Sequence, residues 1–282
     1  MGRVFATTDW HGNWAVAQKV FNFLQPDDKL FYLGDITDRG ENGVKLLQTV
    51  MSDPRIFYIK GNHDEFVELG IEKINYEEDE CNGAPYKPIR REAEKFDLTW
   101  WETMNGGKWT HSDLWKLTKE ERMKIHAYIR NATTEIKYPS KKGTIIILEH
   151  AGYTPGVQEK NKWGKGHDPL WDREHFEQKW NEDEYPYTYI VHGHTPVQYL
   201  KWDFGYIDKP PLTADDMLYK RQFAYDEPTD YRPTILHYCN GHKIDLDMCT
   251  ITSNRVALLD LDTFEEYYFD GEDIPRNKEE LI

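Results

Sequence analysis

Short apolar runs followed by polar clusters recur along this sequence. Five of the runs are rich in β-branched and aromatic residues, which predicts buried strands at residues 4–6, 30–33, 56–59, 145–148 and 189–191. The segments between the first three runs, 14–24 and 43–51, have the apolar spacing of helices. An order of strand, loop, helix and strand predicts an α/β core.

Two stretches depart from this pattern and predict insertions over the core. Residues from about 65 to 140 are rich in Glu, Lys and Trp, with helical patterns at 88–101 and 117–130, and residues from about 200 to 233 are rich in Tyr, Asp and Pro. Strand patterns return at 234–238, 255–260 and 264–269. Because no repeat or low-complexity linker divides the sequence, we expect residues 1–282 to form one domain that carries the two insertions.

A polar cluster follows each of the five predicted strands. The clusters contain, in chain order, Asp9 with His11, Asp35, Asn62, His150 and His194. Ligands of α/β folds bind beyond the carboxyl ends of the strands. Five separate loops could therefore converge on one site.

Each of the first three clusters also has an ordinary explanation when it is taken alone. The segment Asp9-Trp10-His11 could aim a carboxylate and an imidazole at one ion, or could simply lie on the surface. Segment 34–40, with two acids and an Arg between glycines, could form a salt-bridged turn, and segment 61–64 could be a polar turn at a strand end. Their order and spacing, about one βαβ unit apart, favour a shared role.

Oxygen and imidazole ligands of this kind suit Mn, Fe or Zn better than Ca or a thiolate-bound ion. A shared carboxylate such as Asp35 could bridge two ions about 3.5–4 Å apart, as two-metal hydrolases require. These donors could therefore hold two divalent ions, either of one kind or as a mixed pair; we expect Mn, with Fe or Zn as alternatives.

Composition narrows the possible partners and location. A net charge of -15 repels nucleic-acid phosphate, so nucleic acid is the less expected partner. No apolar run approaches the ~20 residues of a membrane span, and the N-terminus lacks the apolar segment of a signal peptide, so we expect a cytoplasmic protein without a membrane partner. The thiols of Cys81, Cys239 and Cys249 lack metal-type spacing and are expected to be reduced. Nothing in the sequence indicates an oligomeric state.

The segments DWHGN, GDITDRG, KGNHD, LEHAG and VHGHTP, in this order, resemble the calcineurin-like metallophosphoesterases. They are most similar to the phosphoprotein-phosphatase branch, in particular its small phage and bacterial serine/threonine phosphatases of the lambda type. The resemblance covers residues 3–64 and 144–196. It implies an α/β fold, a β-sandwich of two mixed sheets flanked by helices, with helical insertions.

The resemblance also implies a role for each matching residue. Asp9, His11 and Asp35 would hold the first ion, and Asp35 with Asn62, His150 and His194 would hold the second. His63 would be the general acid, oriented by Asp38. The phosphate would be bound by Arg39, Asn62 and Arg173, the last of which follows Trp171 as in the lambda-type members.

Three departures from the family pattern matter. Asp64 stands where the protein phosphatases usually have Glu, which weakens the assignment to that branch. The order His192-Gly193-His194 favours His194 as the ligand, with His192 either supporting the ligands from behind or packing in the core. His242 lacks a family match and is predicted to be a turn histidine.

We hypothesise a phosphomonoesterase of the serine/threonine protein phosphatase type, in which a hydroxide that bridges two metal ions attacks phosphorus. His63 would protonate the leaving oxygen, and a phosphoprotein or a nucleotide would be the substrate. A dinucleoside-polyphosphate hydrolase, or a phosphatase or phosphodiesterase of nucleotide or nucleic-acid ends, is the first alternative. Its base could stack on tryptophans that could equally be core residues, namely Trp100, Trp101, Trp109, Trp115 and Trp163. A non-catalytic metal-binding scaffold is the second alternative.

Overall fold

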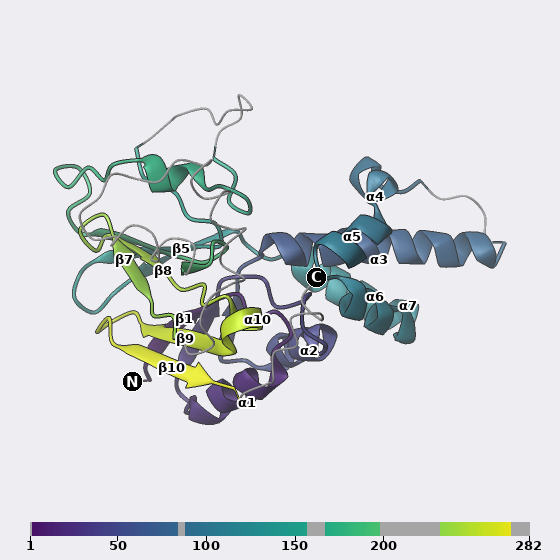
Figure 1. The fold of residues 1–282 in the computed structure, drawn as a ribbon, viewed down its shortest axis with the longest axis horizontal. Coiled ribbons are helices and arrows are strands. Elements are labelled where there is room, and N and C mark those ends of the chain that lie inside the picture. The colour runs from purple at the N-terminus through teal and green to yellow at the C-terminus, as the bar shows by residue number, and fades with distance from the viewer. Residues whose placement is uncertain (1, 84–87, 157–166, 198–231, 272–282) are drawn as a thin grey trace.

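Two five-stranded sheets form the centre of the computed structural model, which describes residues 2–83, 88–156, 167–197 and 232–271 (Figure 1). The first sheet has the order β10 (Glu266–Asp270), β9 (Arg255–Asp260), β1 (Val4–Thr7), β2 (Lys29–Tyr32) and β3 (Ile56–Tyr58). The second has the order β4 (Glu135–Pro139), β5 (Ile145–Glu149), β6 (Thr188–His192), β8 (Lys243–Asp245) and β7 (Leu236–Tyr238).

Both sheets are mixed. Strands β1, β2 and β3 are parallel, β9 pairs antiparallel with β1, and β10 pairs antiparallel with β9. In the second sheet β5, β6 and β8 are parallel, and antiparallel β4 and β7 form the two edges. The expected α/β fold with two mixed sheets is confirmed.

The side chains of β1 show how the sheets pack. Val4 and Ala6 face the second sheet and share a core with Leu148 and Val191, whereas Phe5 points to the opposite side, among helix residues such as Val20. This alternation follows from the two-residue period of a strand. The first sheet is therefore covered on both faces, by the second sheet and by helices.

Helices α1 (Trp14–Phe23) and α2 (Gly43–Ser52) lie on the outer face of the first sheet (Figure 1). Asn13 caps α1, since its side chain accepts a hydrogen bond from the Val16 amide at 3.2 Å. Two short helical turns lie elsewhere: η1 (Glu174–Glu177), whose Phe176 packs with residues of the second sheet, and α10 (Thr250–Ser253), which precedes β9.

Five helices extend away from the sheets as a helical arm, residues 62–130 (Figure 1). They are α3 (Asn62–Cys81), α4 (Arg91–Lys95), α5 (Leu98–Met104), α6 (Lys108–Lys116) and α7 (Lys119–Arg130). The arm is joined to the centre by the first turn of α3, which directly follows β3.

The structure shifts several expected boundaries. The helical stretch begins at Asn62 and ends at Arg130, and residues of the expected insertion near 135–139 form β4. The pattern at 88–101 becomes two helices, α4 and α5. Of the second expected insertion, about 200–233, all but the last two residues lie outside the described residues, as does Trp163.

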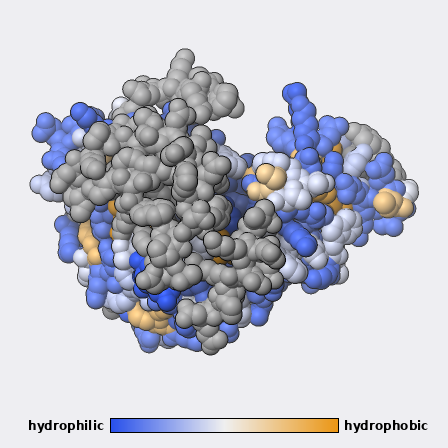
Figure 2. All heavy atoms as spheres, in the orientation of Figure 1, coloured by the Kyte–Doolittle hydropathy of each residue, from blue (hydrophilic) through white to orange (hydrophobic). Residues whose placement is uncertain are grey.

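The surface in Figure 2 is mostly hydrophilic over the described atoms that face the viewer, with small separate hydrophobic spots. Within the described ranges, every helix is too short or too polar to cross a bilayer.

Candidate active site

The polar clusters predicted from the sequence converge where parallel strands of the two sheets end. Buried side chains from five loops meet there, after β1, β2, β3, β5 and β6. They are Asp9, His11, Asp35, Asn62, His150 and His194. Together with His63, they include two groups that could each hold a metal ion, His11–Asp35–His63 and Asp35–His150–His194. Asp9 Oδ1 lies 3.7 Å from His11 Nε2.

Strained backbone marks the same loops. Six residues in these loops have φ between 45° and 69°, namely Asp9, His11, Asp35, Asp38, Arg39 and His194. Non-glycine residues rarely adopt this left-handed conformation, which persists only where the surrounding structure enforces it. Close packing enforces it here, since a Cβ on Gly61 would lie 2.2 Å from Asp35 Oδ1 and one on Gly193 would lie 2.2 Å from Asp9 Oδ2.

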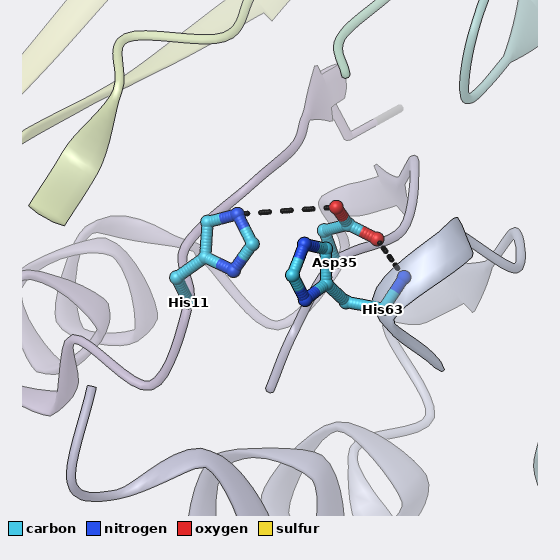
Figure 3. A group of neighbouring side chains, drawn as sticks. All are labelled: His11, Asp35 and His63. Atoms are coloured by element: carbon cyan, nitrogen blue, oxygen red, sulfur yellow. Dashed lines mark hydrogen bonds and ion pairs between the residues drawn. The ribbon is translucent and has the colours of Figure 1, made fainter. Parts of the chain in front are cut away.

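Asp35 lies between the two groups. Its Oδ2 is 3.8 Å from His11 Nε2, and its Oδ1 is 3.5 Å from His150 Nε2. The backbone amide of His63 donates to Oδ1 at 2.9 Å, which fixes the carboxylate (Figure 3). One carboxylate thus presents a separate oxygen to each histidine group, as a bridging ligand requires.

The donors of the second group fit a cation. His150 Nδ1 donates to the Leu33 carbonyl at 2.7 Å, so in the neutral ring Nε2 carries a lone pair. That nitrogen lies 2.9 Å from Asn62 Oδ1, which in the amide orientation seen here is also an acceptor. Asn62 Oδ1 also lies 2.9 Å from His194 Nδ1, and His194 Nε2 is buried without a hydrogen-bond partner among the described residues. The facing acceptors His150 Nε2 and Asn62 Oδ1, beside this unpartnered nitrogen, suit a positive ion.

Burial sets the protonation of these groups. It lowers the pKa of His150 and, more strongly, those of His11 and His194, so the imidazoles are neutral and able to bind metal. Burial, with the nearby charges of Asp9 and Asp64, raises the pKa of Asp35 well above its usual range. A divalent cation would reverse that shift, since it favours the ionised carboxylate.

Arg39 spans the entrance of the first group. Its guanidinium donates to His11 Nε2 at 2.8 Å and to His63 Nε2 at 2.9 Å. The two rings meet edge to face, with centroids 4.9 Å apart. Arg39 therefore places its donors beside both imidazoles and close to the Asp35 carboxylate.

His63 is held by the helical arm as well as by the loops. Its Nδ1 donates to Asp38 Oδ2 at 2.9 Å, and the same oxygen accepts the Trp101 indole N–H at 2.7 Å. Burial raises the pKa of Asp38 to about 7, an effect that the hydrogen bond from Trp101 opposes. The helical arm thus contacts the hydrogen-bonded pair of His63 and Asp38 directly, through Trp101.

Residues 2–198 match the family model described as Calcineurin-like phosphoesterase. This chain belongs to the calcineurin-like phosphoesterases. It is therefore a phosphoester hydrolase. The family uses divalent metals, and this chain has His and Asp clusters able to bind them.

Solved calcineurin-like and phosphatase structures share the fold at low sequence identity. A putative diadenosine tetraphosphatase aligns with a TM-score of 0.51 and 14% identity, over 97% of this chain and 95% of that one. A cold-active protein tyrosine phosphatase of a psychrophilic Shewanella species gives 0.52 and 14%, over 95% and 77% of the two chains. No curated protein matches the sequence. At these identities the likeness shows the fold and leaves the substrate open.

Arg173, the second arginine expected from the calcineurin-like pattern, lies on the other side of the site. Its Nε donates to Thr195 Oγ1 at 3.1 Å, and its terminal nitrogen lies 3.4 Å from the His194 carbonyl oxygen. Arg39 and Arg173 therefore approach the two metal-capable groups from different loops.

Asp64, which departs from the usual residue of the phosphoprotein-phosphatase branch, is the main organiser of the Asp35 loop. Its Oδ2 accepts from the amides of Asp35 and Gly61, both at 2.9 Å, and its Oδ1 accepts from the Ile36 amide at 3.2 Å. Sequence reasoning missed this role, although the position of Asp64 at the start of α3 is where a carboxylate commonly accepts backbone hydrogen bonds.

His192 and His242, the two further histidines that the sequence comparison singled out, lie outside the metal-capable groups. His192 is buried and bonds to the Tyr238 hydroxyl at 2.7 Å, and burial lowers its pKa to about 3. His242 follows the turn between β7 and β8 and stacks between Trp180 and Tyr189. Both positions agree with the packing and turn roles predicted for them.

A third group able to hold a metal lies in the helical arm. It consists of Glu68, Glu72 and His126, on α3 and α7. Sequence reasoning did not find it, because the three residues carry no motif and come together only when the two helices pack.

Proposed function

We propose that this calcineurin-like phosphoesterase is a phosphomonoesterase that uses two divalent metal ions. The observation that carries the proposal is the position of Asp35, whose two oxygens face separate histidine groups while Arg39 lies across the first. Mn is the favoured metal, with Fe or Zn as alternatives, because carboxylate, amide and imidazole donors suit these ions.

The first ion would be held by Asp9, His11 and Asp35, and the second by Asp35, Asn62, His150 and His194. When bound, such a pair activates water for attack and offsets the charge that develops on the phosphoryl oxygens. The protein supplies the buried donors already in place, since hydrogen bonds to Thr37 and Leu33 fix the rings of His11 and His150.

Arg39 and Arg173 would bind the phosphoryl oxygens. A guanidinium offers paired N–H donors whose geometry matches phosphate, and Arg39 needs only to exchange its imidazole acceptors for phosphate oxygens. Positioning and charge stabilisation of this kind provide most of the catalysis in phosphoryl transfer.

His63 would donate the proton that the leaving alkoxide needs. Its Nε2 faces the site, where it contacts Arg39, and its Nδ1 is fixed by Asp38. The Asp38 carboxylate favours the imidazolium form and orients the ring. A phosphoprotein and a nucleotide both present a suitable ester, and the surface beside the site would choose between them.

The proposal is tested with metal-stripped protein reloaded with Mn, Fe or Zn. We expect hydrolysis of p-nitrophenyl phosphate, much slower hydrolysis of bis-p-nitrophenyl phosphate, and no reaction before reloading. Bound metal without hydrolysis of either ester would instead support the non-catalytic scaffold. Preference for the diester would replace the phosphomonoesterase with a phosphodiesterase.

A further inference from the structure

Two exposed indoles, Trp100 and Trp171, lie near the site and both contact the buried ring of Phe66; we name these three rings the aromatic wall. The ring centroid of Phe66 is 5.5 Å from that of Trp100 and 5.6 Å from that of Trp171. Phe66 and Trp100 come from the helical arm, whereas Trp171 comes from the loop before η1. The wall therefore joins the arm to the second sheet's side of the site.

The wall touches both the proposed acid and a proposed metal ligand. The Phe66 ring meets the His63 ring with centroids 5.4 Å apart, and the Trp171 ring meets the His194 ring at 5.9 Å. A general acid must lie within hydrogen-bond reach of the leaving oxygen. A group attached to an oxygen that His63 protonates would therefore lie close to the Phe66 end of the wall.

Exposure separates the wall from the core tryptophans. Trp100 is 45% exposed and Trp171 is 38% exposed, while Trp101 is fully buried against Asp38. Phe66 is buried beneath the two exposed indoles and links them. Two large rings thus remain partly open to solvent next to the proposed phosphate site.

We propose that the aromatic wall binds a planar aromatic ring carried by the alcohol part of the substrate. The site would then take phosphomonoesters of ring-bearing alcohols, which include nucleoside 5'-phosphates and arylmethyl phosphates, in preference to plain alkyl phosphates. This inference rests on the proposed phosphomonoesterase function and adds a substrate class to it. Aromatic side chains stack on flat rings and lose little conformational entropy in doing so.

The distance of the ring from phosphorus decides which indole it meets. Trp171 contacts a proposed metal ligand directly, whereas Trp100 is separated from His63 by Phe66. A ring one carbon from the ester oxygen would stack on Trp171. A base on the far side of a ribose would extend to Trp100 as well.

The test compares two matched pairs of esters on the Mn-loaded protein. Adenosine 5'-monophosphate is paired with ribose 5-phosphate, and benzyl phosphate is paired with cyclohexylmethyl phosphate. All four are esters of primary alcohols, so differences in leaving group are small and the ratio of kcat/KM within a pair reports the ring. We expect a ratio of about 10 in at least one pair, in line with the strength of aromatic stacking.

Two substitutions locate the effect. Where the wild-type protein shows a raised ratio, Trp171→Ala should bring that ratio down to about 1. Trp171→Phe should restore part of the preference. Trp100→Ala should reduce the nucleotide ratio alone. The matched control is Trp115→Ala, because Trp115 is 44% exposed on α6 but contacts His111 instead of the wall. The control should leave both ratios unchanged.

The outcomes separate the two proposals. A raised ratio for only one pair identifies the source of the ring and supports the wall. Ratios near 1 in the wild-type protein, or raised ratios that neither Trp171→Ala nor Trp100→Ala changes, would overturn it. If none of the four esters is hydrolysed while p-nitrophenyl phosphate is, the wall proposal is overturned and the phosphomonoesterase stands; if p-nitrophenyl phosphate is not hydrolysed either, the phosphomonoesterase proposal itself fails.

Discussion

Within the described residues, two regions bring Asp or Glu carboxylates and histidines close enough to hold a metal, and they differ in the charges that surround these donors. In the active site Asp35 faces His150 and His194, and in the helical arm Glu68 and Glu72 face His126. Donor types and spacing are similar. The comparison therefore depends on what surrounds the donors.

In the arm, cations from the protein already neutralise the acids. Glu68 pairs with Lys60, Arg90 and Arg130, and Glu72 pairs with Arg90 and His126. In the active site the groups around Asp35 are mainly neutral imidazoles and further carboxylates, and Arg39 donates to the imidazoles. Ligand chemistry alone does not distinguish the two regions, but the charge around it does.

The pKa values of the two carboxylates, Asp35 and Glu68, are shifted in opposite directions. The pKa of Asp35 is raised by burial and by Asp9 and Asp64. Burial also raises the pKa of Glu68, but the contacts with Lys60 and Arg90 outweigh it and the net pKa is lowered. A buried carboxylate with a raised pKa gains from a divalent ion, whereas one with a lowered pKa has its charge compensated already.

The largest effect is expected from Asp35→Asn. We predict loss of metal and a fall in kcat/KM of more than about 100-fold, since even partners outside a ligand set cost about 10–100-fold in metal affinity or activity. Metal content by elemental analysis and turnover of p-nitrophenyl phosphate measure both. The same acid-to-amide change in the arm, Glu68→Gln, should alter neither metal content nor turnover. Equal metal loss in the two variants would contradict the difference proposed between the active site and the arm.

A smaller effect is expected from His63→Asn. The variant should keep its metal but lose about 100-fold or more in kcat with an alkyl phosphate, because a general acid contributes about 10²–10⁴-fold. With p-nitrophenyl phosphate, whose leaving group needs no proton, the loss should be much smaller. Similar losses with both esters, alongside reduced metal content, would make His63 a ligand instead of the acid.

Trp101→Phe should have a moderate effect. It removes the indole donor to Asp38 Oδ2 while it keeps a buried ring, and a hydrogen bond to a charged group contributes about 1.5 kcal/mol, or roughly tenfold in kcat. If Trp101 acts through Asp38, then adding Trp101→Phe to an Asp38→Asn variant should cause almost no further loss of kcat. Fully additive losses would show that Trp101 acts independently of the pair of His63 and Asp38.

Glu68→Gln should leave activity intact and lower stability. The change weakens three ion pairs of a buried carboxylate and should cost about 2 kcal/mol at neutral pH, measured by urea unfolding. Because the folded pKa of Glu68 is lowered, its contribution is present above the ordinary carboxyl pKa and is lost as pH falls through the folded value. The wild type and variant should therefore converge in acid, and a difference that grows below pH 4.5 would contradict this assignment.

The sequence predicts the active-site cluster better than the arm for a physical reason. Asp9, Asp35 and Asn62 each follow an apolar strand, and parallel strands place their carboxyl ends together, so one-dimensional order already implies proximity. The arm cluster depends on how α3 packs on α7, which leaves no local pattern. The bond from Trp101 to Asp38 joins residues 63 apart and gives no signal beyond an ordinary apolar indole.

Strand β4 and the early start of α3 were also missed. Residues 135–139 form an edge strand with Lys and Pro, composition that is common in edge strands and weakens the apolar signal. Asn62 and His63 appear as a polar turn in sequence, yet they are the first residues of a helix whose Asp64 accepts the loop amides. Tertiary hydrogen bonds, which the sequence does not reveal, decide both cases.

The most direct measurement is an anomalous-difference map from crystals grown with Mn. We predict two peaks, both in contact with Asp35, one beside Asp9 and His11 and the other beside Asn62, His150 and His194. The group of Glu68, Glu72 and His126 should have no peak. A peak in the arm, or only one peak at Asp35, would contradict the two-metal site and the distinction between the two regions.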